Sequence, residues 1–125
     1  MMVSGSYVAS DMSSESDSIF NEKHFHLTYG GAKHNPTDNT VNGLGTSFYY
    51  YHQLNEEHYA ATSTDILRPA ERAFVAMQYA DESPACVAYS GTDNRTFVMG
   101  FPFECIRDAA TRASLMSGIL HFLLE

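Results

Sequence analysis

The sequence predicts an α/β layered domain, in which helices cover one β-sheet. Two observations carry this prediction: short apolar or alternating runs in the C-terminal half, and a helical pattern that follows them. The runs are "AFVAMQY" (73–79), "ACVAYS" (85–90) and "TFVMGF" (96–101). Apolar strands followed by an amphipathic helix are typical of a sheet that is covered by helices.

The last two strands are joined by the turn-rich segment "GTDNR" (91–95). A short linker of this kind between two β-prone runs predicts an antiparallel hairpin. The chain then continues into "GFPFECIRD" (100–108), which separates the hairpin from the final helix.

The final helix is predicted over "AATRASLMSGILHFLL" (109–124), with Asp108 as its N-cap. Gly118 weakens this helix slightly and would permit close packing. An apolar face follows from the helical spacing of Leu115, Met116, Ile119 and Leu123, and it is widened by Leu120 and Phe122.

The N-terminal half is less regular. Residues 1–3 are typical of the end of a buried strand, and "SSESDS" (13–18) of the start of a helix. The Gly-, Asn- and Pro-rich segment 29–45 predicts a long irregular connection. Residues 46–54 are β-prone through their aromatic side chains, and 60–71 are expected to form loop and turn.

Composition limits the class of protein. The chain has 125 residues, 44% of them hydrophobic and 13% aromatic, which fits one globular domain. Its net charge of −8 disfavours binding to nucleic acid.

Cys86 and Cys105 form no CxxC pair, which argues against a disulfide scaffold or a structural zinc site but leaves one isolated bridge possible. No segment approaches the roughly 18 apolar residues of a membrane span, so we expect no membrane partner.

Two segments qualify as a functional site, because chemistry in open α/β sheets lies beyond the carboxyl ends of the strands. They are residues 4–11 and residues 102–104. Ser6 is a candidate nucleophile or a side chain that satisfies loop backbone groups. Glu104 is a functional carboxylate or a cap for the final helix. Asp11 either joins Ser6 and Glu104 in a polar pocket or caps the helix that follows it.

Other candidates lie outside these segments. Tyr50, with Tyr49 and Tyr51, offers stacking faces to a sugar or packs in the interior, and interior packing is favoured because alternate strand residues face inward. If residues 24–26 form a strand, His24 and His26 share one side of it, a geometry that a metal uses, but no third ligand is identifiable. Two half-exposed histidines are favoured, and we assign no metal site.

The two cysteines differ in their expected accessibility. Cys86 lies within a β run and is expected to be a buried small hydrophobe. Cys105 is expected to be the more accessible thiol, because it lies beside Glu104 at the end of a strand.

The segments "VSGSYVASD" (3–11), "YAATSTDILRP" (59–69) and "GFPFE" (100–104) resemble the second half of a class I glutamine amidotransferase-like domain, which is flavodoxin-like. The version that they resemble occurs in large Bacteroidetes proteins labelled xanthan lyases. The resemblance implies a partial flavodoxin-like three-layer domain, whose preceding strands and helices would lie upstream of Met1. Residues 1–125 would then form a single but incomplete domain.

The resemblance also implies that the amidotransferase triad is lost. In working members a Cys lies in a tight Gly-x-Cys-x-Gly turn, and a His-Pro-Glu follows a later strand. Ser6 falls at the nucleophile position, but neither flanking glycine is present, and Val8 opposes a strained turn there. Pro102 falls where the base belongs and cannot accept a proton, whereas Glu104 is retained.

The leading expectation is therefore a non-catalytic accessory or scaffold domain of a larger polysaccharide-associated protein. The alternative is a hydrolase that uses Ser6 with Glu104 or a histidine. A third possibility, a protein-interaction module, predicts an exposed apolar face. Expected partners are the rest of a larger polypeptide or a second chain covering the open sheet edge, and a carbohydrate. We expect no cofactor, and an exported parent protein would place the domain in the periplasm or outside the cell.

Overall fold

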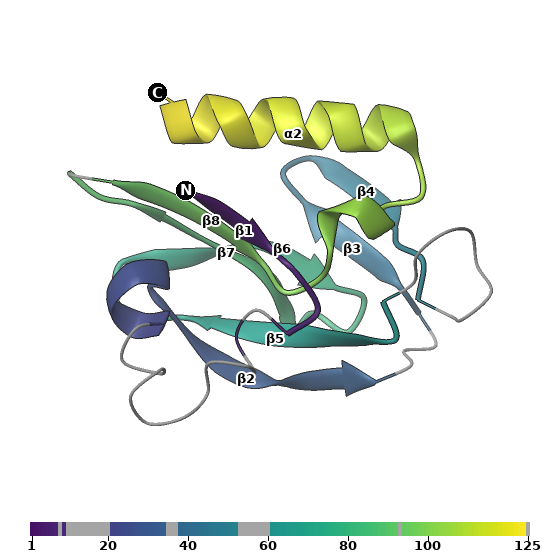
Figure 1. Ribbon diagram of the computed structural model, residues 1–125, viewed down its shortest axis with the longest axis horizontal. Coiled ribbons are helices and arrows are strands. Elements are labelled where there is room, and N and C mark those ends of the chain that lie inside the picture. Colours follow the sequence, from purple (N-terminus) through teal and green to yellow (C-terminus); the bar gives the residue numbers. More distant parts are fainter. Residues whose placement is uncertain (8, 10–20, 35–37, 53–60, 93, 125) are drawn as a thin grey trace.

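The computed structural model describes residues 1–7, 9, 21–34, 38–52, 61–92 and 94–124. The helix α2 (Ala109–Leu124) lies on one side of a six-stranded sheet, and a two-stranded sheet lies on the other side (Figure 1). The α/β class predicted from the sequence is confirmed. Within the described part of the chain, the layer opposite α2 consists of two strands and the short helical segment Asn21–Phe25.

The six-stranded sheet is mixed and has the order β1-β8-β7-β6-β3-β4. Strands β1 and β8 are parallel, and all the other neighbours are antiparallel. The bounds are β1 (Met2–Ser4), β3 (Thr40–Gly43), β4 (Thr46–Tyr49), β6 (Ala73–Tyr79), β7 (Pro84–Ser90) and β8 (Arg95–Met99). The predicted strands of the C-terminal half and the β7–β8 hairpin are confirmed, with Val87 opposite Val98.

Strands β7 and β8 are apolar because both of their faces are covered. Residues 85–88 and 96–99 are all buried. Val87 and Val98 pack with Leu27 and Leu67 of the two-stranded sheet. The alternate residues of both strands contribute to the larger core with Leu115 and Ile119 of α2. A strand buried on both faces shows a nearly continuous apolar run.

The two-stranded sheet pairs β2 (Leu27–His34) with β5 (Ser63–Pro69) in an antiparallel register. This corrects two expectations, because segments 29–45 and 60–71 were predicted to be irregular. Strand β2 was not predicted because glycines lie within it. Its register shifts between Tyr29 and Ala32, where Gly31 has a φ of +117°.

A tight hairpin joins β3 and β4. Segment 29–45 was predicted to be an irregular connection, and this hairpin shows that its last residues belong to strand β3 and a regular turn. Its two turn residues, Leu44 and Gly45, have φ angles of +53° and +74°, as a two-residue hairpin turn of the common type requires. Gly43 pairs with Thr46 at the base of this turn. The β-prone stretch 46–54 contains β4 and is confirmed over Thr46–Tyr49.

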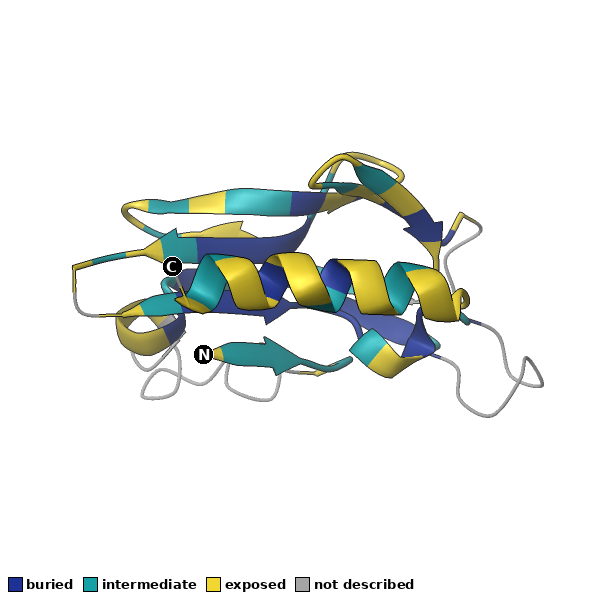
Figure 2. Ribbon diagram, turned by 90° about the horizontal axis from the view of Figure 1, so that it is seen from above, coloured by how far each residue is buried: buried dark blue, intermediate teal, exposed yellow. Residues whose placement is uncertain are grey.

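Helix α2 begins after Asp108, as predicted. The carboxylate of Asp108 accepts hydrogen bonds from the Ala110 amide at 3.2 Å and the Thr111 hydroxyl at 2.7 Å. The apolar face turns toward the sheet (Figure 2). Leu115 and Ile119 are buried, whereas Met116, Phe122 and Leu123 are half-buried.

Two expectations about α2 were wrong. Leu120 does not widen the apolar face, because its side chain is 46% exposed. Gly118 does not mark a close contact either, since a Cβ at this position would meet nothing within 4 Å.

Two short helical segments complete the described chain, η2 (Asn21–Phe25) and η3 (Phe103–Cys105). None of the helices in the described ranges is long and apolar enough to cross a membrane.

Candidate functional site

The two segments predicted to carry the site lie side by side. Because β1 and β8 are parallel neighbours, their carboxyl ends lie at the same end of the sheet, where Ser4 is in register with Met99. The Phe103 amide donates a hydrogen bond to Ser4 Oγ at 3.4 Å. This hydrogen bond joins the loop that follows β1 to the segment that follows β8.

Ser6 lies in the turn after β1 and is half-buried. Glu104 is exposed on η3, beyond the end of β8. Glu104 is not the cap of the final helix, because Asp108 fills that role. Asp11 lies outside the described residues, so the three-residue polar pocket stays a prediction.

Sequence reasoning missed the buried carboxylate of Asp65 in β5. Asp65 is 0% exposed, and its Oδ2 atom accepts a hydrogen bond from the Ala9 amide at 2.8 Å. The main chain of Asp65 also donates to the Gly100 carbonyl at 2.7 Å. Asp65 therefore fixes both the loop after β1 and the end of β8. The sequence signal for this role was the aspartate beside the apolar residues Ile66 and Leu67. A fully buried carboxylate is rare and needs a hydrogen-bond partner.

Tyr50 is not placed to stack on a sugar, which corrects the binding role considered for it. Its side chain is 0% exposed, and its ring stacks on Phe101 at a centroid distance of 5.7 Å. Burial raises the pKa of the Tyr50 hydroxyl above its usual value. Its neighbour Tyr49 is 55% exposed, so the predicted inward placement of one tyrosine in this run is confirmed.

Cys105 is not the accessible thiol that was expected. It is 0% exposed, and burial together with the charge of Glu104 raises its pKa to about 12. Cys86 is also buried, as predicted, and burial raises its thiol pKa well above the usual value. Neither thiol has the depressed pKa of a nucleophilic cysteine, and both are free rather than paired.

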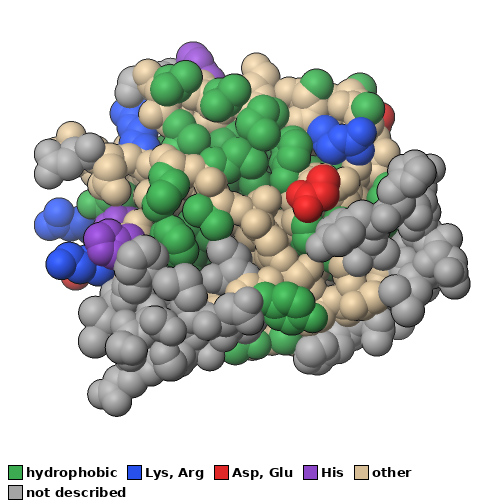
Figure 3. All heavy atoms as spheres, viewed as in Figure 1, with side chains coloured by type: hydrophobic (Ala, Val, Ile, Leu, Met, Phe, Trp, Pro, Cys, Tyr) green, Lys and Arg blue, Asp and Glu red, His purple; other side chains and the backbone are tan. Residues whose placement is uncertain are grey.

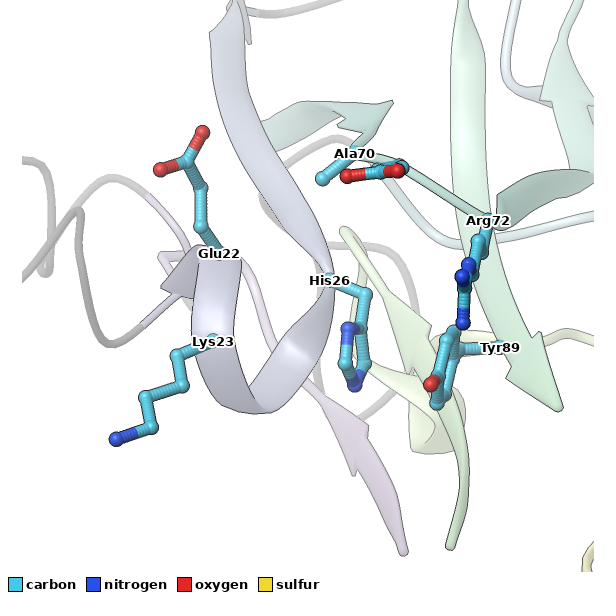
Figure 4. A pocket seen from close by; sticks show the side chains of 7 residues that line it. Glu22, Lys23, His26, Ala70, Arg72 and Tyr89 are labelled. Carbon is cyan, nitrogen blue, oxygen red and sulfur yellow. The ribbon is translucent and has the colours of Figure 1, made fainter. Parts of the chain in front are cut away.

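A second, polar site lies at the other end of the molecule and was not predicted. This pocket, called the His26 pocket below, has a volume of about 510 Å³. It is formed by η2, the β5–β6 connection and β7 (Figure 4). Its lining residues are Glu22, Lys23, His26, Ala70, Glu71, Arg72 and Tyr89. Residues 24–26 do not form a strand, because His24 lies in η2 and His26 follows it, so the condition for the paired-histidine geometry is not met. The described residues contain no cluster suited to a metal ion.

The His26 ring is held by stacking. Its centroid lies 3.5 Å from that of Tyr89, with an interplanar angle of 16°. Its Nε2 atom has no hydrogen-bond partner among the described residues. Burial and the neighbouring His24 lower the pKa of His26, which favours the neutral imidazole.

The backbone of the His26 pocket is strained at two places. His26 has a φ of +59° and Arg72 a φ of +68°, a region that costs a non-glycine residue roughly 1–3 kcal/mol. The Ala70 amide donates to the His26 carbonyl at 2.8 Å and so ties the two segments together. Strain of this kind concentrates at functional sites.

Comparison with known proteins bears on the fold. No family model and no curated protein matches the chain. The chain is similar to the solved structure of Gan42B, a GH42 β-galactosidase, with a TM-score of 0.55 and 14% sequence identity. The match covers 80% of this chain and 13% of that chain. The likeness defines the class of protein as a mixed α/β domain whose fold is shared with a small part of a much larger chain.

Proposed function

We propose that this chain is a non-catalytic accessory domain of a larger, polysaccharide-associated protein, built on a partial flavodoxin-like fold. One observation carries the proposal: β1 is an edge strand that pairs with β8 on one side only within the described part of the chain. An open edge is a place where another strand pairs. The partner is the remainder of the same polypeptide or a second chain.

The surface around this edge supports docking of a partner. Hydrophobic side chains gather on the face that carries α2 and β1 (Figure 3). Leu120 and Leu124 of α2 are 46% and 82% exposed, and Met1 is 55% exposed. Exposed apolar side chains that gather on one face mark a surface for interaction.

The chemistry at the sheet edge supports the loss of amidotransferase activity. Pro102 is buried where the resemblance expects a histidine base, and proline accepts no proton. Cys105 is buried, with a pKa of about 12, and does not replace the missing nucleophile. The likeness to part of a β-galactosidase chain agrees with a domain that serves a larger carbohydrate-active protein.

Hydrolysis separates this proposal from the alternative, a hydrolase that uses Ser6. We would measure cleavage of 4-nitrophenyl acetate, 4-nitrophenyl β-galactoside and glutamine by the chain and by its Ser6→Ala variant. We expect equal background rates from both proteins. A rate that Ser6→Ala abolishes, with unchanged circular dichroism, would establish the hydrolase instead.

Self-association tests the docking surface. Sedimentation velocity of the isolated chain should show association that grows with concentration, because the open edge and the apolar side chains have no partner. Leu120→Glu combined with Leu124→Glu should weaken this association. Ser114→Glu, an exposed polar position on the same helix outside the surface that Leu120 and Leu124 form, is the matched control and should leave it unchanged. A chain that stays monomeric at all concentrations would contradict the docking surface.

A further inference from the structure

The His26 pocket combines features of a binding site that is separate from the sheet edge. Its volume of about 510 Å³ lies within the range of small-molecule sites. The residues come from η2, the β5–β6 connection and β7, so the fold brings together three segments that are distant in sequence (Figure 4). None of them belongs to the edge formed by β1 and β8.

Two strained residues face the same pocket. Four non-glycine residues in the described part of the chain have positive φ angles, and two of them, His26 and Arg72, line this pocket. Leu44, Arg72 and Glu82 lie in turns between strands, where such angles are common, and the Ala73 amide closes the turn at Arg72 by donating to the Ala70 carbonyl at 3.1 Å. His26 lies between η2 and β2, so its positive φ is the one in this group that does not belong to a turn between strands.

The charges of the pocket cancel. Glu22 and Glu71 supply two carboxylates, whereas Lys23 and Arg72 supply two cations. An anion would meet the carboxylates, and a cation would meet Lys23 and Arg72, so neither gains a clear advantage. A neutral ligand rich in hydroxyl groups uses both kinds, donating to the carboxylates and accepting from the guanidinium.

The stacked rings supply an apolar wall beside these polar groups. His26 stacks on Tyr89, and Arg72 lines the same pocket (Figure 4). An aromatic wall with hydrogen-bonding groups around it suits a sugar ring, which has apolar C–H faces and a polar rim.

We infer that the His26 pocket binds a short, uncharged saccharide, with a sugar ring beside the stacked His26–Tyr89 pair and Arg72 bound to its hydroxyl groups. This inference goes beyond the accessory role and does not depend on the lack of catalysis. Ser6 and Glu104 take no part in it.

The test is an NMR titration of the full chain with lactose, cellobiose and maltose, and separately with glutamine and galacturonic acid. A neutral disaccharide should cause saturable amide shifts at His26, Arg72 and Tyr89. Arg72→Gly should weaken binding at least tenfold. Because glycine accepts the φ of +68° at this position, the variant should remain folded.

Glu82→Gly is the matched control. Glu82 has a φ of +71° and lies in the turn after β6, away from the pocket residues. It should leave saccharide binding unchanged, and so should Ser6→Ala. Absence of shifts with all three disaccharides, or wild-type affinity in Arg72→Gly, would overturn the inference. Shifts with glutamine alone would assign the pocket to a zwitterion and refute the saccharide. These binding results do not affect the outcome of the hydrolysis assay with Ser6→Ala. The saccharide inference can therefore fail while the accessory role stands, and the accessory role can fail while the saccharide inference stands.

Discussion

Gly100 lies against the main chain of Asp65, so closely that a Cβ at position 100 would come within 2.1 Å of the Asp65 carbonyl oxygen. The Asp65 amide donates to the Gly100 carbonyl at 2.7 Å. The Tyr79 hydroxyl donates to the Asp65 carbonyl at 2.6 Å. These contacts join the end of β8 to β5 and so hold the two sheets together at the edge where the candidate site lies.

Gly100→Ala should destabilise the protein by about 3 kcal/mol or more, because the new methyl group meets backbone atoms that cannot move aside easily. Urea unfolding followed by circular dichroism measures this loss. Gly118→Ala is the control, because a Cβ there meets nothing within 4 Å. It should stabilise α2 by roughly 0.5–1 kcal/mol. Equal unfolding midpoints for Gly100→Ala and the wild type would refute the close approach.

Tyr79→Phe removes the hydroxyl that donates to the Asp65 carbonyl. Tyr79 is only 2% exposed, so the carbonyl loses a buried partner. We expect a loss of about 1–2 kcal/mol in the free energy of unfolding. Tyr49→Phe, at a side chain that is 55% exposed, should change stability by less than about 0.5 kcal/mol. Similar effects from both substitutions would show that the Tyr79 hydrogen bond contributes nothing specific.

Both thiols should be inert in the folded protein. Cys86 and Cys105 are 0% exposed, and the pKa of Cys105 is raised to about 12, so the reactive thiolate is scarce at pH 8. Ellman's reagent should label no thiol rapidly in native buffer and two thiols per chain in guanidinium chloride. Fast labelling of one thiol in native buffer would contradict the burial of both cysteines.

The C-terminal half of the fold was predictable because its signals are local. Strands β6, β7 and β8 are apolar runs bounded by turn residues, and α2 follows a visible cap at Asp108. These patterns are set by neighbours in sequence, so reading the chain alone recovers them.

The two-stranded sheet was missed because tertiary contacts override local composition. Strand β5 begins with Ser63, Thr64 and Asp65, all of which are buried although they are polar. Strand β2 contains Gly30 and Gly31, which are typical of loops. These segments form strands by pairing with each other and packing on β7 and β8, and neither contact is visible in sequence.

The candidate site was predicted in part. The segments after β1 and β8 were each predicted as a place for a functional site because each follows a strand, and the hydrogen bond from the Phe103 amide to Ser4 Oγ shows that they meet. The role of Asp65 and the His26 pocket depend on segments that are distant in sequence. No motif marks them, because their residues meet only in the folded chain.

Lys33 of β2 forms an ion pair with Asp81 of the turn after β6. The Asp81 carboxylate also accepts the Ser83 amide at 3.0 Å. Hydrogen bonds from Lys33 and Ser83 lower the pKa of Asp81 to about 2, from a usual value of 3.8. Because the folded pKa lies below the unfolded one, the stabilisation is present above pH 3.8 and is lost as the pH falls through about 2.

The Asp81 side chain is 56% exposed, so solvent screens the pair and its contribution should stay below about 1 kcal/mol. Asp81→Asn should therefore lower stability slightly at pH 6 and flatten the loss of stability between pH 4 and pH 2. Lys33→Met removes the larger cause of the pKa shift and should restore most of the Asp81 pKa toward its usual value. Urea midpoints measured from pH 2 to pH 6 test both variants, and a slope in Asp81→Asn as steep as in the wild type would assign the acid sensitivity to other carboxylates.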